Sequence, residues 1–179
     1  MTTVAALAGR RIDAAEAREP RFPLANVARV RAAIAAVLRD QRVGALVCSA
    51  ACGVDLIALD LAAERGIRCR IVLPFAAARF RATSVADRPG DWGPLFDRLV
   101  RAAQAAGDLV VIEPDGDDSA AYRTATATII SEAKALARGG ELVAIAAWEG
   151  EPRGDNDHTE EFRRLAAAAG FRAFTVSTV

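Results

Sequence analysis

Hydrophobic residues follow two different spacings along the chain. Short runs in which nearly every position is apolar are typical of strands that are buried on both faces of a sheet. Apolar residues that repeat at intervals of three and four are typical of helices with one buried face. The runs predict strands at 4–8, 43–48, 67–73, 109–112, 142–148 and 171–176. The repeats predict helices at 27–38, 54–65, 119–138 and 162–169.

This alternation of strands and helices predicts a single doubly wound α/β domain over residues 1–179, with a mainly parallel sheet of about six strands. Right-handed crossovers would place the first strand at the centre, in the order 3-2-1-4-5-6. Ligands of such sheets bind outside the carboxyl ends of the strands, at the switch point. The candidate positions therefore follow the strand ends, at 9–11, 49–53, 75–81, 113–118 and 148–159.

The turn after the second strand consists almost entirely of small residues. Its members Ser49, Ala50, Ala51, Cys52 and Gly53 lead directly into the predicted helix. One interpretation is that a phosphate approaches the free amide groups at the start of that helix. The alternative is that small residues only allow the strand and helix to pack closely. The sequence does not decide between these two interpretations.

The first strand ends in Gly9-Arg10-Arg11 and lacks the glycine pattern of dinucleotide-binding dehydrogenases. A guanidinium group can hold a phosphate or a carboxylate through two parallel hydrogen bonds. Arg10 and Arg11 are therefore candidate ligand contacts. The alternative is that they are solvated loop charges that pair with Asp13 and Glu16.

The segment after the fifth strand contains the only histidine of the chain, His158. The spacing of Asp157 and Glu160 resembles a capping box before the last helix, which would explain both residues structurally. His158 is either an exposed loop residue or a ligand contact.

The segment 75–107 has no strand pattern but contains several aromatic and arginine residues. They could stack a base and hold a phosphate, or the aromatic residues could form a small hydrophobic cluster. We favour the cluster for Trp92 and Phe96. The residues in question are Phe75, Phe80, Trp92, Phe96, Arg79, Arg81 and Arg88.

Composition narrows the class of protein. The chain is 53% hydrophobic and 26% charged, which is typical of a globular domain. Its net charge of zero and its single lysine disfavour nucleic acid and anionic membranes as partners. Three cysteines with no zinc spacing predict free thiols and no metal site. With no signal-peptide pattern and no apolar run of about 18 residues, we expect a soluble cytoplasmic protein.

In their order and spacing, the motifs along nearly the whole chain resemble the SLOG superfamily. That group includes the DNA-processing protein DprA and the LOG nucleoside-monophosphate phosphoribohydrolases. The resemblance rests on 9–13, on the small-residue turn with its Gly-hydrophobic-Asp helix start at 48–55, and on 73–85, 142–150 and 154–159. The later segments resemble a bacterial signalling subgroup.

The resemblance implies a Rossmann-like fold and a small nucleotide-like ligand, with no tightly held cofactor. It adds Trp148, Gly154 and Thr159 to the expected ligand contacts. LOG enzymes carry a Pro-Gly-Gly-x-Gly-Thr-x-x-Glu segment, and in an alignment on Thr159 this chain has Phe162 at the position of the catalytic glutamate.

We therefore expect a domain that binds or senses a nucleotide-derived ligand and has no assigned catalytic residue. Two alternatives remain open: an N-glycosidic hydrolase that uses Glu149, Glu160 or Glu161, and a protein–protein interaction module. Association into a homo-oligomer also stays open.

Overall fold

The computed structural model describes residues 2–112 and 117–179. It contains a six-stranded sheet in which every pair of neighbouring strands is parallel, in the order β4-β3-β2-β1-β5-β6. The predicted class, a doubly wound Rossmann-like α/β fold, is confirmed. The strands are β1 (Thr3–Gly9), β2 (Val43–Cys48), β3 (Arg68–Leu73), β4 (Leu109–Val111), β5 (Leu142–Trp148) and β6 (Arg172–Ser177).

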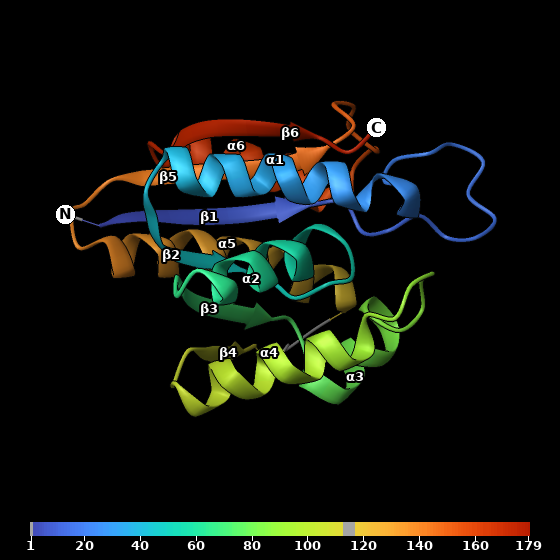
Figure 1. Cartoon of the computed structure of the whole chain (residues 1–179), viewed down its shortest axis with the longest axis horizontal. Coiled ribbons are helices and arrows are strands. Elements are labelled where there is room, and N and C mark those ends of the chain that lie inside the picture. The colour runs from blue at the N-terminus through green and yellow to red at the C-terminus, as the bar shows by residue number, and fades with distance from the viewer. Residues whose placement is uncertain (1, 113–116) are drawn as a thin grey trace.

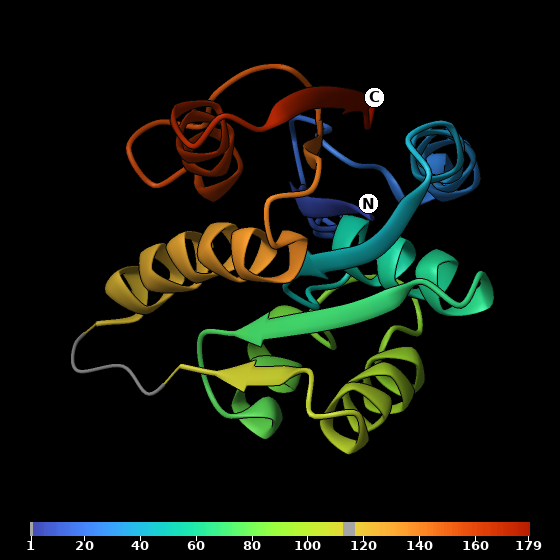
Figure 2. The same ribbon diagram turned by 90° about the vertical axis from the view of Figure 1, so that its left-hand side faces the viewer.

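Helices cover both faces of the sheet, as Figures 1 and 2 show. On one face lie α1 (Val27–Asp40), which follows a short 3-10 turn at Leu24–Asn26, α2 (Val54–Glu64), α3 (Ala77–Ser84) and α4 (Gly93–Ala105). On the other lie α5 (Asp118–Ala137) and α6 (His158–Ala168). Neighbouring residues of β1 serve opposite faces: Leu7 belongs to the first core and Ala6 to the second.

The predicted strand order is wrong in one respect. Strand β4 lies at the edge beside β3, and β5, not β4, is the second neighbour of β1. The cause is the segment between β3 and β4, where α3 and α4 form although no helix was predicted. They make one more crossover on the same face as α1 and α2, so β4 is placed beyond β3. The 20-residue α5 then crosses the opposite face back to β5 (Figure 2).

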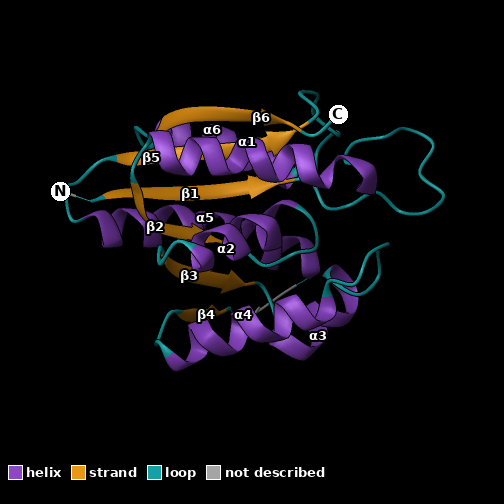
Figure 3. Cartoon of the chain, viewed as in Figure 1, coloured by secondary structure: helices purple, strands orange, loops and turns teal. Residues whose placement is uncertain are grey.

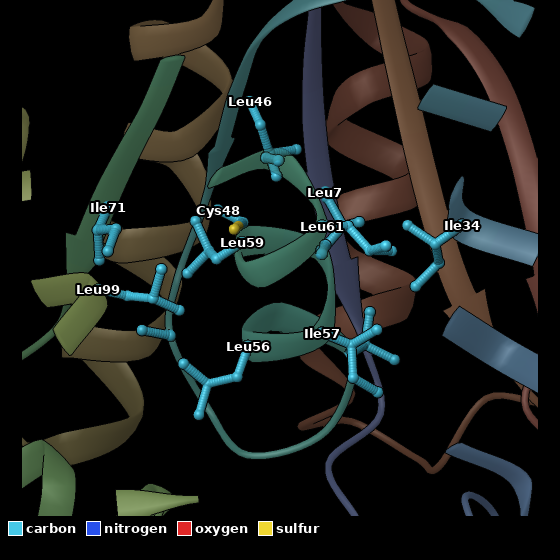
Figure 4. Close-up of a cluster of buried hydrophobic side chains, with 14 of the residues drawn as sticks. Leu7, Ile34, Leu46, Cys48, Leu56, Ile57, Leu59, Leu61, Ile71 and Leu99 are labelled. Atoms are coloured by element: carbon cyan, nitrogen blue, oxygen red, sulfur yellow. The ribbon is translucent and has the colours of Figure 1, made fainter. Parts of the chain in front are cut away.

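The aromatic residues of the segment 75–107 belong to the main core. Trp92 and Phe96 are buried there, and the rings of Phe80 and Phe96 stack with their centroids 6.1 Å apart. The interpretation as a hydrophobic cluster is thus confirmed, although the cluster is continuous with the core under α2. Figure 4 shows that core, with Leu56 and Leu59 of α2 among side chains from β2, β3 and α4.

Two helix ends show how local sequence sets the boundaries. Helix α2 ends at Glu64 and is followed by Gly66 with a φ of 66°, the left-handed conformation in which glycine often terminates helices. Helix α6 begins at His158, four residues before the predicted start, because the Asp157 side chain caps it. Within residues 2–112 and 117–179, no helix combines the length and apolar character needed to span a bilayer.

The switch point of the fold lies between β1 and β5. The chain leaves β1 toward α1 on one face and leaves β5 toward α6 on the other. A long loop, residues 10–23, extends beyond the carboxyl end of β1 in Figure 3. At the carboxyl ends of β1 and β5, the two loops therefore run to opposite faces of the sheet. A ligand cleft forms at such a point in open α/β sheets.

Candidate functional site

Two adjoining cavities lie at the carboxyl ends of β1, β2 and β5, and we call them together the switch-point cleft. The larger, the polar arm, has a volume of about 440 Å³ and is lined mainly by the loops after β1 and β5. The smaller, the apolar arm, has a volume of about 140 Å³ and reaches toward β2 and α5. Both arms are lined by Gly9, Arg11, His158 and Thr159, so these four residues mark their junction.

A buried ion-pair network forms the floor of the polar arm. Arg10, only 4% exposed, binds both oxygens of Asp157 at 2.7 and 2.8 Å. Its other N–H groups bind the Glu149 carboxylate and the carbonyl oxygen of Glu151. Arg21, from the loop after β1, also pairs with Glu149. Two guanidinium groups thus neutralise two carboxylates and connect β1, β5 and α6.

This network fixes the ionisation of Asp157. Burial alone would raise the pKa of its carboxyl group. Hydrogen bonds from Arg10 and from the backbone N–H groups of Glu160 and Arg153 outweigh burial and lower the pKa to about 2. Asp157 also caps α6, accepting from the N–H of Thr159 and of Glu160. The predicted cap is confirmed for Asp157, whereas the Glu160 side chain pairs with Arg163.

Arg153 supplies positive charge to the polar arm without a carboxylate partner in the described part of the chain. Partial burial is the largest effect that lowers the pKa of its guanidinium group. The nearby positive charges of Arg21 and Arg10 lower this pKa further. Arg88 lines the same arm and lies 3.6 Å from Asp87. Five arginine and three acidic side chains thus line the polar arm, although the whole chain is neutral.

The apolar arm is lined by side chains from both faces of the sheet. Phe80 and Pro74 contribute from one side, and Tyr122 and Ile129 from α5. The Tyr122 ring stacks on the imidazole of His158 with the centroids 5.1 Å apart, and its hydroxyl bonds to Ser84. The result is a narrow, mostly apolar space, as ligand pockets commonly are.

One buried carboxyl group lines this apolar arm. Asp55 is 7% exposed and accepts a hydrogen bond of 3.1 Å from the N–H of Ala51. Burial raises its pKa to about 7, against the opposing effects of the Ala51 N–H and the charge of Arg11. Asp55 can therefore be either protonated or ionised near neutral pH.

Three buried polar atoms in the described residues have no hydrogen-bond partner, and all three belong to the cleft. They are Arg11 Nε, Ser49 Oγ and His158 Nδ1, the last of which lies 3.8 Å from a carboxylate oxygen of Glu161, beyond hydrogen-bond distance. More than about 90% of buried polar groups in folded proteins are hydrogen-bonded, so such exceptions indicate a missing partner. Their gathering around one cleft is what a ligand-binding site would produce.

Three amide groups of the small-residue turn and the start of α2 are already bonded within the protein. The N–H of Ala51 donates to Asp55, that of Cys52 to the Ser84 carbonyl, and that of Val54 to the Arg10 carbonyl. A Cβ on Gly53 would lie 2.9 Å from the Arg10 carbonyl oxygen, and the φ of Gly53 is 99°. The geometry therefore favours close packing, the second of the two interpretations, for this turn.

The cleft brings together seven of the twelve residues expected to contact a ligand: Gly9, Arg10, Arg11, Ser49, Ala51, His158 and Thr159. Ala50, Cys52, Gly53, Trp148 and Gly154 line neither arm. Cys48 and Cys52 are buried free thiols, and Cys69 is free and partly buried. The interpretation of Arg10 and Arg11 as solvated charges pairing with Asp13 and Glu16 is wrong, because Arg10 is buried and Arg11 pairs with Asp87.

None of the glutamates considered for catalysis lines either arm of the cleft. Glu149 is held by Arg10 and Arg21, and neither arm is lined by Glu160 or Glu161. Phe162, which stands at the position of the LOG catalytic glutamate, is fully buried in the core under α6. This position therefore supplies no carboxylate to the cleft. Of the candidate segment 113–118, residues 113–116 lie outside the described residues.

Sequence reasoning missed Arg21, Arg153, Tyr122 and the side chain of Asp55 as parts of the site. Tyr122 had no detectable signal, because its position depends on how α5 crosses the sheet. Asp55 could have been found, since Ala58, Leu59 and Ala62 follow it at helical spacing and an acidic residue on an apolar helix face requires a partner. No protein-family model and no curated protein matches the chain.

Proposed function

We propose that this protein binds a small phosphorylated ligand of the nucleotide class in the switch-point cleft. The observation that carries the proposal is the set of three unpartnered buried polar atoms around one cleft. The shape of the cleft supports a ligand with two unlike ends. One arm offers arginine side chains to an anion, and the other offers an apolar slot with Tyr122 to a ring.

The arginines of the rim, rather than the amides of α2, are the groups that would hold the phosphate. Arg153 has no carboxylate partner in the described residues, and Arg88 is only loosely paired. Five arginines line the polar arm against three acidic residues, and exposed Glu19 lies 3.7 Å from Arg21. Asp13 accepts from the N–H groups of Arg21 and Phe22, and Asp157 is held by Arg10. An anion would therefore meet a net positive surface.

The resemblance to the SLOG superfamily points to the same class of ligand. A sensing role in bacterial signalling is part of that proposal. Binding is favoured over N-glycosidic hydrolysis because the glutamates at 149, 160 and 161 do not line the cleft. A bare protein–protein interaction module would leave the unpartnered atoms of the cleft without an explanation.

The test is calorimetric titration with nucleoside 5′-monophosphates, the matching nucleosides and ribose 5-phosphate. We expect the phosphorylated compounds to bind more tightly than the nucleosides. Arg153→Gln should weaken nucleotide binding about tenfold. This is the lower end of the loss expected for one charge-assisted hydrogen bond, because Arg153 is solvent-accessible. The control is Arg101→Gln, on α4 and outside the cleft. Equal binding of nucleosides and nucleotides, or no effect of Arg153→Gln, would refute the proposal.

A further inference from the structure

Apart from Arg11, His158 and Thr159, which it shares with the polar arm, the apolar arm contains two polar groups that point to a particular kind of ligand ring. The Ser49 hydroxyl is buried without a partner. One oxygen of Asp55 accepts from the Ala51 N–H, and within the described residues the other oxygen has no recorded hydrogen bond. Thr126 and Tyr122, which line the same arm, are both satisfied, by the Tyr122 carbonyl and by Ser84 respectively.

A ligand in this arm would thus meet apolar faces and one polar edge. The faces come from Phe80, Ile129 and the Tyr122 ring, which suit a flat ring. The polar edge consists of a carboxylate, which only accepts hydrogen bonds, and a hydroxyl, which can donate or accept. The carboxylate is complementary to an N–H donor on the ring and repels a carbonyl oxygen, and the hydroxyl can accept a second hydrogen bond from the same donor group.

We propose that the apolar arm is a base-binding subsite in which Asp55 and Ser49 select nucleobases that carry an exocyclic amino group over those with a carbonyl group at the same position. This inference rests on the proposed function, because it assumes that the phosphate lies in the polar arm. Asp55 is then a specificity-determining residue rather than part of the packing of α2.

A substitution can invert this preference. In Asp55→Asn, the amide oxygen can still accept from the Ala51 N–H, and the amide nitrogen then faces the ligand in place of the carboxylate oxygen. Its N–H group donates to a carbonyl and leaves an amino group without an acceptor. A site built for one hydrogen-bonding pattern discriminates strongly against the opposite pattern, because buried polar groups are left unpaired.

The experiment compares matched nucleotides, AMP with IMP and CMP with UMP, by calorimetry at pH 8, above the pKa of about 7 of Asp55. The wild type should prefer the amino-bearing member of the tighter-binding pair at least tenfold. Asp55→Asn should remove or reverse that preference, and Ser49→Ala should reduce it. The control is Asp60→Asn, the same change on α2 at a residue that pairs with Arg31 and Arg98 outside the cleft.

The outcomes separate the two proposals. Tight binding of all four nucleotides without preference, or a preference that Asp55→Asn leaves unchanged, overturns the base-binding subsite and leaves the phosphate site standing. No binding of any of the four overturns both. Thermal unfolding of each variant verifies its folding, and Asp55→Asn should fold, because it replaces a buried carboxyl group with a neutral group of the same shape.

Discussion

Removal of the Arg10 side chain should destabilise the protein far more than removal of an exposed arginine. Arg10 is 4% exposed and makes five hydrogen bonds, to Glu149, Asp157 and the Glu151 carbonyl. In Arg10→Met, an apolar chain of similar length would leave the 1%-exposed Asp157 side chain without its guanidinium partner. Glu149 would keep only Arg21.

The magnitude follows from the burial of these groups. Breaking a buried ion pair by removing one partner costs about 3–5 kcal/mol, because the remaining charge is uncompensated. For a protein of this length, each kcal/mol lowers the melting temperature by about 2–4 °C, so we expect a decrease of about 6–20 °C. Arg39→Met is the control. Arg39 is exposed and pairs only with exposed Asp40, so the change should stay within about 0.5 kcal/mol.

Urea denaturation followed by circular dichroism measures the free energy of unfolding of both variants. The double variant Arg10→Met/Asp157→Asn tests the cause, because neutralising Asp157 should recover part of the loss. If Arg10→Met unfolds at the same urea concentration as Arg39→Met, the network does not stabilise the fold and the reasoning fails. The reasoning also fails if the loss of unfolding free energy in the double variant equals the sum of the losses in Arg10→Met and Asp157→Asn.

Two further predictions concern acid stability and catalysis. Since the pKa of Asp157 is lowered to about 2, its contribution of about 2 kcal/mol is present above pH 4 and is lost as pH falls from about 4 to 2. Asp157→Asn, which keeps a good helix cap, should flatten that part of the stability curve, whereas Asp97→Asn at an exposed pair should change it little. Incubation with AMP should release no ribose 5-phosphate above background, as measured by a reducing-sugar assay, because Phe162 is buried and the neighbouring glutamates do not line the cleft. Steady release that Glu160→Gln or Glu161→Gln abolishes would contradict this.

The strands could be predicted from the sequence because the signal for each is local. The ranges 43–48 and 142–148 agree with β2 and β5 at both ends. The strand order could not, because it depends on whether the chain between β3 and β4 makes another crossover. Helix α3 has a weak periodic pattern and α4 begins at Gly93-Pro94 in a segment rich in turn residues. The edge position of β4 cannot be predicted unless the crossover through α3 and α4 is predicted first.

The site was predictable only where it depends on strand ends. Gly9 ends β1, Arg11 lies two residues beyond it and Ser49 follows β2 directly, so the rule that ligands bind at the carboxyl ends of strands finds them. Arg10 was assigned the wrong partner because its carboxylates, Glu149 and Asp157, are about 140 residues away in the chain. No spacing rule connects charges at that separation, and only the pairing of β1 with β5 brings them together.

The division of the arginines would explain how a neutral chain attracts the proposed anionic ligand at one place. The inner arginines, Arg10 and Arg21, neutralise Glu149 and Asp157, so these two carboxylates do not oppose an anion in the polar arm. Because Glu149 and Asp157 are already neutralised, they do not cancel the positive charge of the outer Arg153. Stability and ligand affinity should therefore separate. Loss of Arg10 lowers both, because it exposes two carboxylates beneath the ligand, whereas loss of Arg153 lowers affinity alone.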